Sequence, residues 1–290
     1  MSDGKMKIYE FGESCWANVP KIAIAETDTP SDQVEWVSIV LAEPWLIVVQ
    51  GKNFDPEYLK INPNGTVPTL IVDGKTFTDS TTVVSEILKR APHPPRVSAH
   101  TSTSIIEEVH GANHDPNALL LSSVSDEDRQ AKINGIPKGF LEGRQKALDE
   151  YTPNAPAEFK RFLEEKQKGN RQFLEFYTGN PDEATRQAHY KATKEMWNSA
   201  GIVIRGVITQ ALQKTSGPFA GGDKPGEPDF HIISWLARMA TDAGVAPGSK
   251  ASEVMPALQK ITGGHAFDPV VSKYWDAWTQ RESFTKNNIH

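Results

Sequence analysis

Cysteine is nearly absent from this sequence, because Cys15 is the only one among 290 residues. A single cysteine excludes an intramolecular disulfide. It also leaves a four-ligand zinc site to be built mainly from histidines and carboxylates. A redox role for Cys15 would need a second thiol from a partner molecule. A chain of this length is instead expected to bury a substantial hydrophobic core, and two domains are the expected organisation.

Long apolar runs and excess basic charge are also missing. Although 38% of the residues are hydrophobic, no run approaches the roughly 20 residues that span a bilayer, so we expect no membrane association. The stretch from Met1 to Lys7 is polar and lacks the apolar segment of a secretion signal, which favours a cytoplasmic location. The 31 basic and 37 acidic side chains give a formal charge of −6 without a basic stripe, which argues against nucleic acid as a partner.

Short strand and helix patterns alternate in the N-terminal part of the chain. Asp73-Gly74 favours a tight hairpin turn between two strands, and Asp55-Pro56 is typical of a helix start. The stretch from Leu41 to Val49 is apolar but interrupted by proline, and it stays unassigned. The predicted elements have the order βαβαββα, and they occupy residues 7–11, 22–26, 35–40, 56–61, 69–72, 75–78 and 80–89.

A change of pattern marks the expected domain boundary. The last predicted helix of the first domain ends at three prolines that form a stiff linker, Pro92, Pro94 and Pro95. We therefore predict an α/β domain at residues 1–91, a linker at 92–95 and a second domain at 96–290.

Helical periodicity dominates beyond the linker, so the second domain is predicted to be all α. The clearest helical patterns cover residues 157–177, 184–213 and 230–242. The region from Asp115 to Pro156 resists assignment, because glycine and proline recur between short helical pieces.

One long motif carries a functional signal. The stretch from Asn62 to Ser80 reads NPNGTVPTLIVDGKTFTDS. Its asparagine-proline, valine-proline and acidic-serine pairs resemble the signature of the cytosolic glutathione transferases. The resemblance implies a thioredoxin-like first domain that binds glutathione as a co-substrate.

The resemblance also implies a role for each residue of the motif. In that family the residue before a cis-proline pairs its backbone with the cysteinyl part of glutathione, as an added strand pairs with a sheet edge. Val67 and Pro68 match these positions, with Thr66 beside them. Ser80, at the start of a helix, would hold the γ-glutamyl carboxylate, and Asp79 would lie nearer the amine.

Two further observations concern these expected glutathione-binding residues. Lys52, just after Gly51, falls near the basic position that some relatives use for the glycine carboxylate of glutathione. A hairpin followed by a capped helix would explain Asp73, Gly74 and Ser80 without any ligand, as in a relative that binds no glutathione. That alternative leaves the Val67-Pro68 step unexplained.

The activating residue is expected after the first strand. Ser14 is the first candidate, because Glu26 follows it by twelve places, as an acidic residue follows the catalytic serine in the serine-type classes. Cys15 is the rival, since a cysteine at a helix N-terminus can become a thiolate. The sequence SCWANVPK departs from the family pattern, in which proline follows the catalytic residue and arginine comes soon after. Trp16 is the best placed tryptophan to line an acceptor pocket.

A second motif lies near the C-terminal part of the chain. The stretch from Phe219 to Arg238 reads FAGGDKPGEPDFHIISWLAR and resembles the family's buried helix. Asp229 takes the acidic place in the first turn, where a carboxylate satisfies free N–H groups. Gly226 replaces the usual serine or threonine cap.

A metal site is not expected. His110 and His114 have the spacing of a metal pair, but glycine and asparagine between them argue against one continuous helix.

Taken together, these features predict a homodimeric glutathione transferase whose thiolate attacks a small hydrophobic electrophile. The length of the chain resembles that of fungal members of the superfamily. Two alternatives stay open: a carrier protein that keeps the glutathione site with little activity, and a thiol transferase or ether-cleaving enzyme that depends on Cys15.

Overall fold

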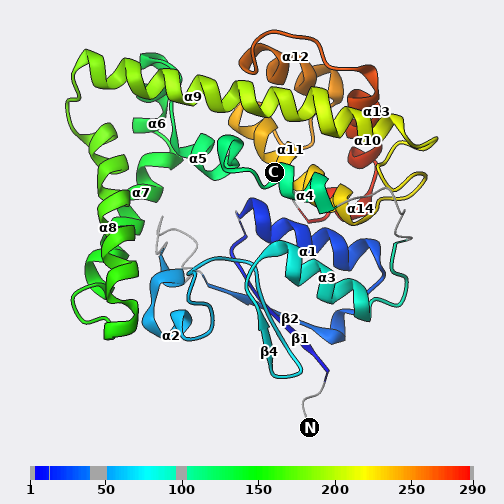
Figure 1. Cartoon of the computed structure of the whole chain (residues 1–290), viewed down its shortest axis with the longest axis horizontal. Helices are drawn as coiled ribbons and strands as arrows, with labels where there is room; N and C mark the ends of the chain where they lie inside the picture. The colour runs from blue at the N-terminus through cyan, green and yellow to red at the C-terminus, as the bar shows by residue number, and fades with distance from the viewer. Residues whose placement is uncertain (1–3, 13, 40–50, 96–102, 288–290) are drawn as a thin grey trace. The chain divides into compact units, whose positions relative to one another are not determined.

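The computed structural model describes residues 4–12, 14–39, 51–95 and 103–287 (Figure 1). Two compact units make up the chain, and each is assembled from three separate stretches. The first unit comprises residues 1–11, 35–79 and 120–193, and the second comprises residues 12–34, 80–119 and 194–290. The domain boundary at residues 92–95 stays a prediction.

The N-terminal elements confirm the predicted order βαβαββα of a thioredoxin-like fold. Two 3-10 turns, η1 (Ser31–Gln33) and η2 (Lys52–Phe54), join them. Leu41 to Val49, which the sequence leaves unassigned, lies outside the described residues. The strands and helices are β1 (Met6–Glu10), α1 (Cys15–Glu26), β2 (Val34–Ser38), α2 (Pro56–Leu59), β3 (Thr69–Val72), β4 (Lys75–Phe77) and α3 (Ser80–Arg90).

The four strands form one sheet of the first unit in the order β2-β1-β3-β4. β1 pairs with β3 in antiparallel register, with Ile8 opposite Leu70, and both side chains are fully buried. β3 and β4 form the predicted hairpin. Asp73 and Gly74 have φ angles of 49° and 72°, the positive values that a type I′ turn requires.

Helix α1 starts earlier than the sequence suggested. The predicted helix covers residues 22–26, whereas the observed helix begins at Cys15, directly after the Ser14 cap. Pro20 lies inside the helix and removes one backbone donor, which is why the pattern looks broken there. Most residues of the first two turns are nonetheless buried, so tertiary packing stabilises this helix more than propensity does.

The first unit also contains helices from the region that resists assignment in the sequence. These are α6 (Asp126–Ile133), α7 (Ile136–Tyr151) and α8 (Ala157–Thr178), followed by the start of α9 (Glu183–Val203). Gly135 caps α7 and Pro137 lies in its first turn, so these breakers mark a helix start rather than a loop. Helices α7 and α8 pack side by side (Figure 1).

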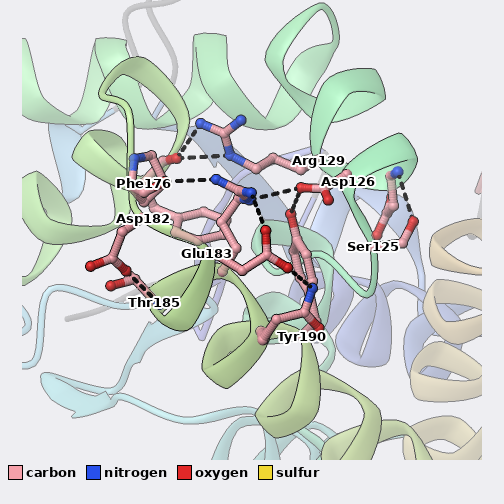
Figure 2. Close-up of polar contacts among 12 residues, drawn as sticks. Ser125, Asp126, Arg129, Phe176, Asp182, Glu183, Thr185 and Tyr190 are labelled. Atoms are coloured by element: carbon pink, nitrogen blue, oxygen red, sulfur yellow. Dashed lines mark hydrogen bonds and ion pairs between the residues drawn. The ribbon is translucent and has the colours of Figure 1, made fainter.

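A polar network joins α6, α8 and the start of α9 (Figure 2). The Tyr190 hydroxyl donates to Asp126 Oδ1 at 2.7 Å, and Arg186 Nε lies 3.0 Å from the same oxygen. Arg129 donates through Nε and Nη2 to the backbone carbonyl of Phe176. These contacts tie the C-terminal end of α8 to α6.

The described residues of the second unit are mainly helical. The 3-10 turn η3 (Ala112–His114) follows α4, and a π-helical segment, η4 (Ile204–Ile208), interrupts the long pattern predicted for residues 184–213. In addition to α1, α3 and the end of α9, the unit contains α4 (Thr103–Val109), most of α5 (Pro116–Leu121), α10 (Thr209–Gln213), α11 (Glu227–Asp242), α12 (Ala251–Ile261), α13 (Pro269–Thr279) and α14 (Glu282–Thr285).

Helix α11 is the core of the second unit, because every residue from Pro228 to Ala240 is buried. Its first turn is held by Asp229, whose carboxylate accepts backbone N–H groups of Ala220, Gly221 and Gly226, each at 2.8 Å. This confirms the structural role predicted for Asp229. The tryptophans predicted to pack helices are all buried: Trp197, Trp235, Trp275 and Trp278.

Candidate functional site

The turn before β3 is fixed by an unusually dense set of hydrogen bonds to one carbonyl. The backbone oxygen of Thr66 accepts from the Tyr58 hydroxyl at 2.6 Å, from Asn62 Nδ2 at 2.9 Å and from the Thr69 hydroxyl at 3.1 Å. The next peptide bond, Val67-Pro68, is cis, as the resemblance implies. The three hydrogen bonds hold the carbonyl of Thr66, directly before Val67, in one orientation.

The residues of this network are themselves buried. Asn62 and Thr69 are fully buried, and burial raises the pKa of the Tyr58 hydroxyl to about 12, so that it stays a neutral donor. Asn62 also accepts from the backbone N–H of Asn64 at 3.0 Å. Tyr58 is a positioning residue that the sequence analysis missed, although the apolar face of the predicted helix at 56–61 would have pointed to its burial.

Thr66 also connects this turn to the loop before α3. Its hydroxyl donates to the carbonyl of Thr78 at 3.2 Å, one residue before Asp79. Asp79 is exposed, and Ser80 begins α3 with a buried side chain. The acidic-serine pair therefore lies at a helix N-terminus, where the backbone N–H groups favour a carboxylate.

Lys52 lies in η2 of the first unit, just after Gly51. Gly51 has a φ of 114°, and a Cβ at this position would lie 2.5 Å from the Cβ of Ala147 on α7. Only glycine fits this close approach, so the backbone before Lys52 packs directly on α7. The assignment of Lys52 to the glycine carboxylate stays a prediction.

Ser14 caps the N-terminus of α1 in the second unit. Its hydroxyl oxygen accepts the backbone N–H of Ala17 at 3.3 Å. A serine hydroxyl has one donor and two acceptor sites, so a cap that uses a lone pair leaves the proton available to donate. The hydroxyl also lies at the positive end of the helix dipole, where an adjacent anion such as a thiolate is stabilised.

Cys15 is placed differently from its neighbour. Its side chain is fully buried, and Sγ donates to the carbonyl of Ser234 at 3.3 Å. Burial raises the pKa of the Cys15 thiol well above its usual range, and the nearby charge of Arg238 opposes this only in part. A buried thiol with a raised pKa is unreactive, so this setting favours Ser14 over Cys15 as the activating residue.

Trp16 follows in the first turn of α1 and is half-buried. Its ring stacks on the imidazole of His110, with centroids 3.8 Å apart and an interplanar angle of 19°. His110 Nε2 in turn lies 2.9 Å from His231 Nδ1 on α11. One face of the Trp16 ring is therefore covered, and any acceptor molecule would have to use its other face or its edge.

The two histidines with metal-pair spacing do not share a helix. Helix α4 ends at Val109, and His114 belongs to the short turn η3. His114 pairs with the Ser199 hydroxyl and the Glu108 carbonyl instead. Within the described ranges no group of three histidine, cysteine, aspartate or glutamate side chains could hold a metal ion, and no helix there has the length and apolarity of a membrane span.

Comparison with known proteins identifies one family domain in the N-terminal part of the chain. Residues 8–95 match the family described as "Glutathione S-transferase, N-terminal domain". Two proteins from Arabidopsis thaliana are similar over 149 residues, or 47% of this chain: Glutathione S-transferase Z1 is 26% identical with 62% of its length covered, and Glutathione S-transferase Z2 is 28% identical with 61% covered. The chain thus matches less than two thirds of the length of these relatives. Residues 8–95 therefore form a glutathione S-transferase N-terminal domain by this match.

A solved structure extends the likeness of fold over nearly the whole chain. The holo structure of maleyl pyruvate isomerase, described as a bacterial Zeta-class glutathione S-transferase, superposes with a TM-score of 0.52 at 16% identity. The match covers 97% of this chain and 95% of the bacterial protein. At this level of identity the likeness is one of fold.

Proposed function

We propose that this protein is a glutathione transferase that conjugates the glutathione thiolate to a small hydrophobic electrophile. The observation that carries the proposal is the family match at residues 8–95, which contains the fixed Thr66-Val67 turn and the acidic-serine pair at the start of α3. In this reading Val67 and Pro68 receive the cysteinyl part of glutathione, Asp79 and Ser80 receive the γ-glutamyl end, and Lys52 receives the glycine carboxylate.

The proposed chemistry depends on thiolate formation. A free thiol has a pKa of about 8.5, so only a few per cent is ionised near neutral pH. The Ser14 hydroxyl would donate to the glutathione sulfur, and the N-terminus of α1 would add its dipole. One charge-assisted hydrogen bond and a helix dipole together supply on the order of 2 kcal/mol, or one to two pKa units.

The remaining features of the proposal follow from the family. The thiolate attacks an electrophilic carbon, and the helical part of the chain supplies an apolar acceptor pocket to which Trp16 contributes. A cytoplasmic location and a homodimer are proposed on the same basis. A carrier protein with little activity would bind glutathione without lowering its thiol pKa. A pH titration of the thiol of bound glutathione therefore separates the two functions.

The decisive experiment titrates bound glutathione by thiolate absorbance near 240 nm. Two variants keep the start of α1 comparable: Ser14→Thr retains the hydroxyl, whereas Ser14→Gly removes it at a cost of only a few tenths of a kcal/mol to the cap. We expect wild type and Ser14→Thr to lower the thiol pKa, and Ser14→Gly to return it toward 8.5 with at least about a tenfold loss of conjugation rate.

Two results would contradict this proposal at different levels. An unchanged thiol pKa in Ser14→Gly removes Ser14 from the mechanism but leaves the binding site. No saturable signal with millimolar glutathione in the wild type removes the function itself.

A further inference from the structure

Two cations of the first unit lie on neighbouring helices without an acidic partner. Arg144 belongs to α7 and Lys166 to α8, the two helices that pack side by side. Within residues 4–12, 14–39, 51–95 and 103–287, neither side chain forms an ion pair with a carboxylate. Other basic residues of these two helices do form such pairs, for example Lys138 with Glu142 and Arg171 with Asp149.

The guanidinium of Arg144 is the more enclosed of the two. Its Cζ lies 5.0 Å from the centre of the Phe54 ring, and Nε is buried without a hydrogen-bond partner. Burial lowers the pKa of this guanidinium, as expected for a cation withdrawn from water. An aromatic face compensates only part of that cost. Among the residues that the structure describes, Nε has no acceptor.

Lys166 lies close by and is open to solvent. Its Nζ is 5.3 Å from the Phe162 ring, and the rings of Phe162 and Phe54 are 6.4 Å apart. The two cations therefore flank one aromatic pair. Burial lowers the pKa of Lys166, and the charge of Arg144 lowers it further. Glu165 acts against this effect, but its carboxylate is held by Arg161 at 2.9 Å.

Two like charges beside an aromatic pair favour the binding of an anion. An unpaired, half-enclosed guanidinium is costly to fold, and its donors match the two oxygens of a carboxylate. The exposed ammonium of Lys166 would attract the anion and contact it at the entrance. We propose that Arg144 and Lys166 form a binding site for the carboxylate group of a small organic molecule.

The position of the site in the first unit suggests two sources for this carboxylate. Phe54, the ring under Arg144, belongs to the same turn η2 as Lys52, to which the glycine end of glutathione is assigned. The bound carboxylate can therefore be the glycine carboxylate of glutathione, or it can belong to a separate organic acid. The site itself rests on the contacts of Arg144 and Lys166 and stands without the proposed transferase activity.

The test measures thermal stability of the full chain with succinate, a small dicarboxylate, against sodium chloride at equal ionic strength. Arg144→Met and Lys166→Met remove the two cations, and Lys146→Met and Lys168→Met remove exposed cations from the same helices as matched controls. We expect a saturable rise of melting temperature in the wild type and in both controls. Arg144→Met should lose this response and, without anion, melt no lower than the wild type.

Glutathione and γ-glutamylcysteine, which lacks the glycine, then distinguish the sources. If Arg144→Met weakens glutathione at least tenfold but leaves γ-glutamylcysteine unchanged, the site holds the glycine carboxylate. If glutathione binding is unchanged while the succinate response is lost, the site takes a separate acid. Succinate binding in a protein that does not bind glutathione supports the site and removes only the transferase proposal.

Two outcomes would overturn the carboxylate site. One is a wild type without a saturable response to succinate or glutathione. The other is an Arg144→Met variant that responds to both as the wild type does, because the guanidinium then contributes nothing to anion binding.

Discussion

Arg281 donates through Nε and Nη2 to the two carboxylate oxygens of Glu26, at 2.6 and 2.5 Å, although 255 residues separate them in the sequence. The Ser283 hydroxyl donates to the same carboxylate. Glu26 is the last residue of α1, and Arg281 directly precedes α14, so the pair fastens the C-terminal helix to the end of α1. The Glu26 side chain is only 8% exposed.

Replacing Arg281 by glutamine should therefore destabilise the protein. The Glu26 carboxylate would lose two charged donors in a largely buried place, and we expect the free energy of unfolding to fall by about 2 kcal/mol. Chemical denaturation measures this change. The exposed pair of Lys286 with Glu282 is the matched control, and Lys286→Gln should change stability by less than about 0.5 kcal/mol. Equal losses of stability from the two substitutions would contradict a stabilising role for the Arg281–Glu26 pair.

Asp229 should stabilise the fold without affecting the affinity for glutathione. Asp229→Ala leaves three backbone N–H groups in the core without their acceptor, and we expect a loss of about 3–5 kcal/mol in the free energy of unfolding. Calorimetric titration of the folded variant should give the wild-type affinity for glutathione. A stable variant with weakened glutathione binding would show that Asp229 serves the site instead.

The same residue should produce a pH dependence. Burial raises the pKa of Asp229 from 3.8 to about 6, against the effect of its three N–H donors. The unfolded chain therefore releases this proton first, and the contribution to stability is present below about pH 4 and lost as pH rises through about 6. Relative to Asp229→Asn, the wild type should lose about 3 kcal/mol over that interval, an order-of-magnitude figure from the two pKa values. A pH-independent difference between the two proteins would contradict the raised pKa.

The contribution of His189 to stability should have the opposite pH dependence to that of Asp229. Its Nε2 accepts the backbone N–H of Ser123 at 3.2 Å, and its ring stacks on Phe176, so the neutral imidazole is the bound form. Burial lowers the pKa of His189 below 6.5, with the charge of Lys132 as the second cause. This contribution is present above about pH 6.5 and is lost as pH falls through the folded pKa. His189→Phe should flatten that part of the stability profile, which denaturation at a series of pH values would measure.

Asn62 should be needed both for the stability of the fold and for glutathione binding. Asn62→Ala removes one of the three donors to the Thr66 carbonyl and the acceptor for the Asn64 N–H. We expect a loss of about 1–3 kcal/mol in the free energy of unfolding and weaker glutathione binding, because the Val67 backbone loses its fixed orientation. Asn64→Ala is the control, since the exposed Asn64 contributes only its backbone N–H. Unchanged affinity in a destabilised Asn62→Ala would separate the network from the binding site.

Cys15 should behave as a core residue. The native protein should resist an aromatic disulfide reagent such as dithiobis(nitrobenzoate), whereas the denatured chain should react at once, because the buried thiol has a raised pKa. Cys15→Ala should retain glutathione conjugation. Rapid labelling of the native protein, or a glutathione mixed disulfide on Cys15 by mass spectrometry, would restore the thiol-transfer alternative.

Turn and helix-cap preferences, which act over a few residues, predicted the secondary-structure elements that depend on local interactions. The hairpin at Asp73-Gly74, the helix start at Asp55-Pro56 and the helix from Ser80 all appear where the sequence predicts them. The start of α1 and the whole of α7 could not be predicted, because proline and glycine weaken the local pattern and burial against other helices compensates.

The sequence by itself determined the likeness to the glutathione transferases, the order of the N-terminal elements and the motif from Asn62 to Ser80, since these depend on side-chain types at fixed spacings. Only the tertiary structure decided that Cys15 is buried and that Tyr58, Asn62 and Thr69 hold one carbonyl. It also decided that Arg144 Nε is buried without a hydrogen-bond partner among the described residues. These properties arise from contacts between segments far apart in the chain. Their energies depend on burial and on the partners that packing provides, and no local pattern encodes either.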